Sequence, residues 1–183
     1  MSRLARLRQD LIAYRPASPD LLVFRDQMRE LCDRGEEAFV RGTFEPGHFT
    51  ASAFVLSADR AQLLLILHAK LGLWLQPGGH VDADDASMIE AARREAIEET
   101  GVEDLEPAHD GIFDVDVHEI PPLGNEPAHR HFDVRFLFRA GQRELRAATD
   151  ARAARWAPLE EIIAGAVSSD ASVGRAARQI VGR

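Results

Sequence analysis

Two stretches near the N-terminus repeat apolar residues at helical spacing. The first stripe consists of Leu4, Leu7, Leu11 and Ile12, with arginines on the other side. It predicts an amphipathic helix. A second helix is predicted after Ser18-Pro19-Asp20, which supplies an N-cap, a proline for the first turn and an acid beside it. We therefore expect a helical segment over residues 1–45. Its apolar stripes require a partner, which is either the rest of the chain or a second copy in a homodimer.

The pattern changes to that of strands after the N-terminal segment. Residues 51–57 and 63–67 are mostly apolar and flank a polar turn, so they predict two strands, the second buried on both faces. Residues 112–120 and 131–139 alternate apolar and polar positions on either side of a loop, which predicts a pair of strands.

The remaining elements complete a mixed order of strands and helices. Residues 156–161 are typical of a strand end that enters a short helix, and 173–180 of a final helix. Because the order lacks a regular βαβ rhythm, the fold class is α/β of the α+β type, and a mixed sandwich is favoured over a Rossmann fold. We expect one domain over 46–183, including the C-terminal helices.

Composition excludes several classes of protein. With 30 acidic and 22 basic residues the chain carries a net charge of −8, which argues against a nucleic-acid surface that neutralises phosphates. No stretch approaches 18 apolar residues, so we expect no membrane span. Cys32 is the one cysteine, which excludes an internal disulfide and fits a reducing compartment such as the cytoplasm. A phosphorylated substrate would need a metal ion between its charge and that of the protein.

The centre of the chain predicts a helix that carries chemistry. Ser87 to Glu90 matches a capping box, and Gly101 stands where a helix C-cap is expected. Within this helix Glu95, Glu98 and Glu99 lie at i, i+3 and i+4, so they share one face within a turn. Three crowded carboxylates repel one another unless a cation joins them, and an all-oxygen set suits Mg²⁺ or Mn²⁺. The alternative for this pattern alone is a solvated acidic face.

The surrounding residues favour the metal site. Pro77-Gly-Gly-His-Val81 precedes the helix, and Arg94-Glu-Ala-Ile-Glu-Glu-Thr-Gly-Val102 lies within it and just after it. Together they resemble the Nudix box, G-x5-E-x7-R-E-U-x-E-E-x-G-U with U apolar. The chain departs from this pattern in two ways: Asp85 replaces the first glutamate, and eight residues instead of seven separate it from Arg94. The extra residue falls at the start of the helix, so we expect it to alter the loop and to leave the helix in phase.

The resemblance implies a Nudix-type α/β/α sandwich and a metal-dependent pyrophosphohydrolase. Such an enzyme cleaves a nucleoside diphosphate linked to another group, using Mg²⁺ or Mn²⁺. It implies that Glu98 and Glu99 are the chief metal ligands, that Glu95 completes the set or acts on the attacking water, and that Arg94 orients the carboxylates. The backbone carbonyl of Gly79, or that of Gly78, is a further expected ligand.

A second polar group lies on the paired strands. Val115, Phe132 and their apolar neighbours point one way, so the opposite face carries the polar residues. Its members are Asp116, His118, His131 and Asp133, with His129 and Glu126 in or beside the loop. The sequence leaves two interpretations open, namely the wet face of a sheet, or a substrate or second-metal patch. His80, next to the paired glycines, is a further candidate for substrate binding.

Two rival functions remain open at this point. A binding module of the same fold would sense a nucleotide without turnover, and the intact glutamate set counts against it. An isomerase resembling the isopentenyl diphosphate type would be expected to use a cysteine in the strand region, and Cys32 is in the predicted helical segment.

Overall fold

The computed structural model describes residues 1–141, 145 and 153–182. Its contacts divide the chain into two compact units. Unit 1 comprises residues 1–52, 79–92 and 110–136, and unit 2 comprises 53–78, 93–109 and 137–183. Helices and strands are interspersed along the chain and the sheet is mixed, so the predicted α+β class is confirmed.

Unit 1 begins with the predicted helices, α1 (Arg3–Ala13) and α2 (Pro19–Leu31), followed by the 3₁₀ helix η1 (Cys32–Phe39). The hydroxyls of Ser2 and Ser18 accept hydrogen bonds from backbone N–H groups of the first turns, so each helix has a side-chain N-cap. Helix α2 packs against the strand β6 (Asp114–Ile120), and Cys32 is fully buried. The apolar stripes of the N-terminal segment therefore pack against the rest of the chain, which is the first of the two predicted partners.

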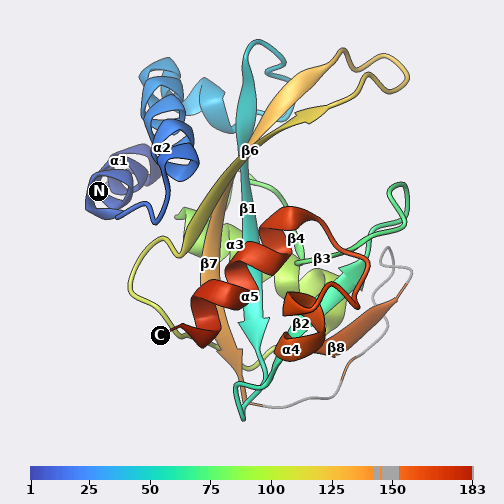
Figure 1. The fold of residues 1–183 in the computed structure, drawn as a ribbon. Helices are drawn as coiled ribbons and strands as arrows, with labels where there is room; N and C mark the ends of the chain where they lie inside the picture. The colour runs from blue at the N-terminus through green and yellow to red at the C-terminus, as the bar shows by residue number, and fades with distance from the viewer. Residues whose placement is uncertain (142–144, 146–152, 183) are drawn as a thin grey trace. The chain divides into compact units, whose positions relative to one another are not determined.

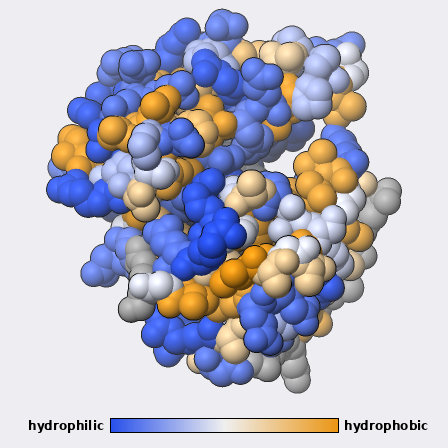
Figure 2. Space-filling model, in the orientation of Figure 1, coloured by the Kyte–Doolittle hydropathy of each residue, from blue (hydrophilic) through white to orange (hydrophobic). Residues whose placement is uncertain are grey.

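One residue of the first apolar stripe was placed wrongly. Leu7 and Leu11 are buried, whereas Ile12 is 61% exposed. The next residue along a helix is rotated by about 100°, so Ile12 cannot share the face of its neighbour Leu11. Most of the face shown in Figure 2 is hydrophilic, and hydrophobic residues form small groups within it.

The strands of unit 1 are paired with one another. Strand β1 (Gly47–Leu56) is buried along its whole length, and β4 (Gly78–His80) pairs with it. Strand β6 pairs antiparallel with β7 (His129–Ala140), which confirms the predicted pair of strands. At Gly47 the φ angle is +141°, and an added Cβ would lie 1.9 Å from the Arg130 carbonyl oxygen, so β1 requires a glycine at its start.

Unit 2 is built around β2 (Gln62–Leu67), which pairs antiparallel with β1, β3 (Trp74–Leu75) and β8 (Ala154–Pro158). The remaining strand, β5 (Leu105–Pro107), pairs with β7. Helices α4 (Leu159–Ile163) and α5 (Ala171–Val181) pack together on the near side of these strands in Figure 1. The sheet order is β3-β2-β1-β7-β5.

The chemistry-bearing helix α3 (Met88–Thr100) begins and ends where the sequence predicts. Gly101 has φ +70° and its N–H donates to the carbonyl of Ile97, as expected of a C-terminal cap. The capping box is wrong in one respect. The Ser87 hydroxyl is buried without a hydrogen-bond partner among the described residues, so it caps no N–H of the first turn.

No helix within the described ranges combines the length and apolarity needed to cross a membrane.

Candidate functional site

The glutamate face consists of Glu95, Glu98 and Glu99 on the second half of α3. Arg94, on the same stretch, donates from Nη1 to Glu95 at 2.9 Å and to Glu98 at 3.1 Å. The Glu98 side chain is 58% exposed and that of Glu95 is 16% exposed. The arginine therefore pairs with two of the three carboxylates and offsets part of their mutual repulsion. Its role in orienting them for a metal ion stays a prediction.

The third carboxylate is fixed by backbone. Glu99 Oε2 accepts a hydrogen bond of 2.9 Å from the N–H of Gly78, at the start of β4. The preceding arginine on the helix, Arg93, has a different task, because its guanidinium donates to the carbonyl of Leu105 and lies over the ring of Phe138. Adjacent arginines thus divide their roles between the glutamate face and the packing of unit 2.

The glutamate face fits a hard divalent cation by the chemistry of its donors. Six carboxylate oxygens on one helical turn match the ligand type that Mg²⁺ and Mn²⁺ prefer. Oxygen atoms taken one each from Glu95, Glu98 and Glu99 do not all lie within 4.8 Å of one another. Among the described residues, the group whose ligand atoms do lie within this distance is His48, His80 and His131. Arg94 occupies two of the glutamates instead. Gly79, whose carbonyl was expected to add a ligand, lies in β4 beside β1, and that role stays a prediction.

The altered loop of the box is supported by the N-terminal helix. Asp85 is 9% exposed and accepts a 2.8 Å hydrogen bond from the N–H of Asp82, so it closes the loop upon itself. Arg3 of α1 donates to the carbonyl of Asp82 at 2.7 Å and to that of Asp85 at 3.3 Å. The sequence did not predict this contact, because 79 residues separate Arg3 from Asp82.

The paired strands bring the second predicted group together. Alternation and loop position predict that these residues lie near one another, and the structure sets Asp116 opposite Asp133 and His118 opposite His131. His118 Nδ1 lies 3.0 Å from Asp116 Oδ2, and the rings of His118 and His131 are 5.6 Å apart.

The interpretation of this face as the wet side of a sheet was wrong for Asp133, which is buried together with Asp114 and Arg135 on the same face. Arg135 is 1% exposed, and its guanidinium nitrogens lie 2.7 Å from Asp133, 3.3 Å from Asp114 and 3.3 Å from Asp116. Burial lowers the pKa of Arg135, but the three carboxylates outweigh burial and raise it. The guanidinium therefore stays charged and holds the carboxylates together.

Asp133 has its oxygens occupied by protein groups. Besides Arg135, the hydroxyls of Thr50 and Ser52 donate to it at 3.1 Å and 2.9 Å. A carboxylate so engaged positions the strands. Its predicted contact with substrate stays a prediction.

A histidine cluster completes unit 1. Its members are His48, His80, His118, His129 and His131, with neighbouring ring centroids 4.9–5.6 Å apart. The sequence analysis missed His48. The available signal was a histidine just ahead of the predicted strand 51–57, because an imidazole that becomes buried needs partners for both nitrogens.

Burial makes these imidazoles weak bases. It lowers the pKa of His131 to about 2, with the neighbouring histidines adding to the effect. It lowers the pKa of His80 to about 4, with Arg41 as the next cause, and it also lowers that of His48. These three rings are therefore neutral at pH 7 and present a lone pair on one nitrogen each.

The sequence was compared with models of known protein families. The NUDIX domain model matches residues 22–176, which is most of the chain. This chain belongs to the NUDIX domain family. It is a Nudix hydrolase that acts on pyrophosphate bonds, as the box predicted. The search of curated proteins found no match.

Solved structures show the same fold. The chain is similar to a NUDIX family hydrolase from Clostridium perfringens, with a TM-score of 0.57, 23% identity, and coverage of 74% of this chain and 96% of that one. It is also similar to an Ap4A hydrolase from C. elegans, with a TM-score of 0.57, 19% identity, and coverage of 73% and 95%. A third is the E. coli dihydroneopterin triphosphate pyrophosphohydrolase, with a TM-score of 0.56, 17% identity, and coverage of 74% and 96%.

Proposed function

We propose that this Nudix hydrolase is a metal-dependent pyrophosphohydrolase that cleaves a nucleoside diphosphate linked to another moiety. The observation that carries the proposal is the glutamate face, which stands on one turn of α3 with Arg94 bridging two of its members. Relatives in fold include an Ap4A hydrolase and a dihydroneopterin triphosphate pyrophosphohydrolase, both named for substrates with a chain of phosphates.

The residues divide the work by their chemistry. Glu98 is more exposed than Glu95 and, with Glu99, is proposed to hold Mg²⁺ or Mn²⁺. Such a cation, when bound, screens phosphate charge, lowers the pKa of water and stabilises charge on the leaving oxygen. Glu95 is less exposed and is kept in place by Arg94, which suits either a further ligand or a group that accepts a proton from the attacking water.

A non-catalytic nucleotide sensor of the same fold is the second candidate that the sequence left open. It would retain the fold without need of all three carboxylates, whereas this chain has all three on one face together with the arginine that pairs with them. The glutamate face therefore favours turnover.

The test is a pair of glutamate substitutions on the same helix. Glu98→Gln keeps the shape of the side chain and removes its charge, so the rate of pyrophosphate-bond cleavage with Mg²⁺ should fall at least about 100-fold. Glu90→Gln in the first turn of α3 is the matched control, since Glu90 is exposed and outside the face.

The assay is release of phosphate or nucleoside monophosphate from a panel of nucleoside diphosphate derivatives, which also identifies the substrate. Equal turnover by Glu98→Gln and the wild type, with both chains folded, would refute the proposal.

The proposal also includes an oligomeric state and a location in the cell. We propose that two copies associate through the N-terminal segment, where Ile12, Leu22 and Val23 are exposed apolar residues on α1 and α2. The mass in solution tests this, because Ile12→Glu with Val23→Glu should leave a monomer. We also propose that the protein works in the cytoplasm, where its buried thiol at Cys32 stays reduced.

A further inference from the structure

We infer that unit 1 holds a second metal site, in which His48, His80 and His131 bind a borderline transition-metal ion of the Zn²⁺ class. These residues, called here the imidazole triad, come from β1, β4 and β7. Its ligand atoms are ring nitrogens of histidine, and it does not use the glutamates of the Nudix box. It does not rest on the proposed function.

The geometry of the triad is that of ligands around one ion. One ring nitrogen of each histidine lies within 4.8 Å of the others. The ring centroids are 4.9 Å, 5.2 Å and 5.4 Å apart. Three rings that point a nitrogen at one tetrahedral ion, at Zn–N distances of about 2.0 Å, have centroids about 5.2 Å apart. The rings are therefore spaced for a shared ion, and small rotations bring the nitrogens to ligand distance.

His48 supplies the strongest single indication. It is 1% exposed, and its Nδ1 lies 3.0 Å from the carbonyl oxygen of Thr43. That bond places the proton on Nδ1 and leaves a lone pair on Nε2. Nε2 is buried without a hydrogen-bond partner among the described residues. A buried acceptor left unpaired costs about 1–3 kcal/mol, and a metal ion supplies the missing partner.

The outer partners are those that metal-binding histidines use. A ligating imidazole ordinarily donates its other N–H to a carbonyl or carboxylate oxygen, which fixes the ring. His48 has such a partner in the Thr43 carbonyl. The two flanking histidines repeat the pattern, because His129 Nδ1 lies 2.8 Å from the Pro127 carbonyl and His118 Nδ1 lies 3.0 Å from Asp116.

The charge around the triad also suits a dication. Arg41 and Glu126, whose fields reach His48 and His80, form an ion pair at 3.6 Å and so contribute opposite charges. The cluster of Asp114, Asp116, Asp133 and Arg135 carries three carboxylates for one guanidinium, and Asp116 links it to His118. An added positive ion lowers the cost of this excess negative charge.

The ligand chemistry selects the metal class. Imidazole nitrogens suit Zn²⁺, Co²⁺, Ni²⁺ and Cu²⁺, whereas Mg²⁺ requires oxygen. Three histidines leave a fourth tetrahedral position for water or for an oxygen of a bound molecule. The glutamate face of α3 thus offers oxygen ligands for a hard cation, and the imidazole triad offers nitrogen ligands for a transition metal.

The experiment titrates Zn²⁺ alone into the metal-free full chain that carries Glu98→Gln and Glu99→Gln, so that the glutamate face is removed as a competitor. Calorimetry should give one ion per chain with Kd below about 1 μM. Replacing that ion with Co²⁺ should give the visible absorption of a tetrahedral nitrogen site. The assay of pyrophosphate-bond cleavage is separate, so failure of the proposed function leaves this result intact.

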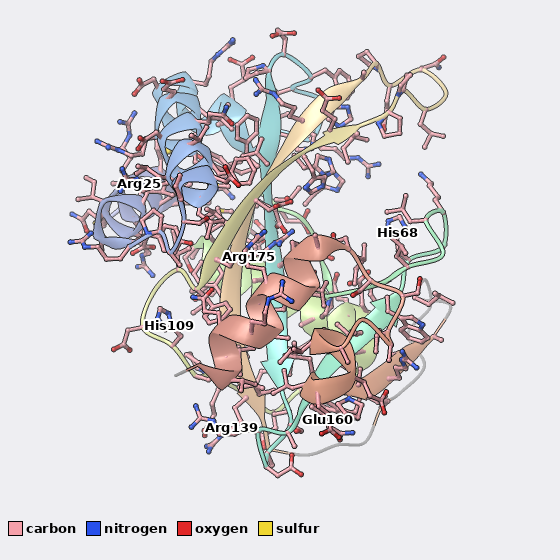
Figure 3. All side chains as sticks on the ribbon, in the orientation of Figure 1. Arg25, His68, His109, Arg139, Glu160 and Arg175 are labelled. Atoms are coloured by element: carbon pink, nitrogen blue, oxygen red, sulfur yellow. The ribbon has the colours of Figure 1, made fainter. Side chains whose placement is uncertain are left out.

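Substitutions in this background assign the ligands. His131→Ala and His80→Ala should each weaken zinc binding more than about 100-fold, beyond the loss caused by an outer-sphere change. His68→Ala is the matched control, since His68, labelled in Figure 3, lies on the loop after β2. His80 and His131 are partly exposed, so circular dichroism of both variants should show the fold retained. Zinc affinity equal to the background in both variants, or no zinc binding by the background, would overturn the inference.

Discussion

The glutamate face and the imidazole triad differ in how the chain assembles them. Five consecutive positions of α3 contain the whole glutamate face, whereas the triad draws on β1, β4 and β7 and spans residues 48–131. The glutamates are charged, partly exposed and held by Arg94. The imidazoles are largely buried and neutral, because burial lowers their pKa values. A local motif can thus present charge to water, while neutral ligands in a buried place require tertiary structure.

The largest expected effect comes from the arginines that serve the two regions. Arg135→Met leaves Asp114, Asp116 and Asp133 buried without their cation, so the free energy of unfolding should fall by about 3–5 kcal/mol. Arg94→Met removes pairs at a partly exposed helix face and should cost less than about 1 kcal/mol, while lowering the rate of hydrolysis. Urea denaturation of both variants makes the measurement.

The contrast fails if the two substitutions destabilise the chain equally. Arg135→Lys sharpens it further, since a lysine keeps the charge but cannot reach three carboxylates at once, and its loss of stability should lie between those of wild type and Arg135→Met.

The pH dependence of stability should separate the regions next. His80 and His131 have pKa values below that of an unfolded histidine, about 6.5. The unfolded chain then binds more protons than the folded chain below pH 6.5, so stability is full above that pH and falls as the pH drops toward about 4. For the metal-free chain we expect a loss of about 1–3 kcal/mol between pH 7 and 5.5.

The comparison variant is His131→Phe, which keeps an aromatic ring and removes one titrating group. Its stability should depend less steeply on pH over the same range. An identical slope for this variant and for wild type would contradict the assignment of the pH effect to the histidine cluster.

A further expected effect concerns the box loop. Arg3→Met removes two charge-assisted hydrogen bonds to the carbonyls of Asp82 and Asp85 and should cost about 1–2 kcal/mol. Amide exchange across residues 81–87 should quicken, with Arg6→Met as the control because Arg6 is exposed on the same helix. Unchanged exchange across the loop would show that it holds its shape without α1.

Short-range patterns gave much of the fold. Caps, helical spacing and strand alternation predicted α1, α2, α3 and the pairing of β6 with β7, which brings Asp116 and His118 near His131 and Asp133. Each depends on contacts within one turn or on the period of side chains along a strand. Ile12 was placed wrongly because it cannot share the helix face of its neighbour Leu11, and the Ser87 cap was wrong because the buried hydroxyl has no N–H partner among the described residues.

By itself the sequence determined the family and the glutamate face, since every member of that face lies on one helical turn and helix geometry fixes their spacing. Tertiary structure alone decided that the polar face of β6 and β7 is buried around Arg135, and that His48 joins His80 and His131. Alternation along a strand says which side a residue faces, but not whether another element covers that side. Burial is set by packing between distant segments, and burial is what makes those imidazoles neutral.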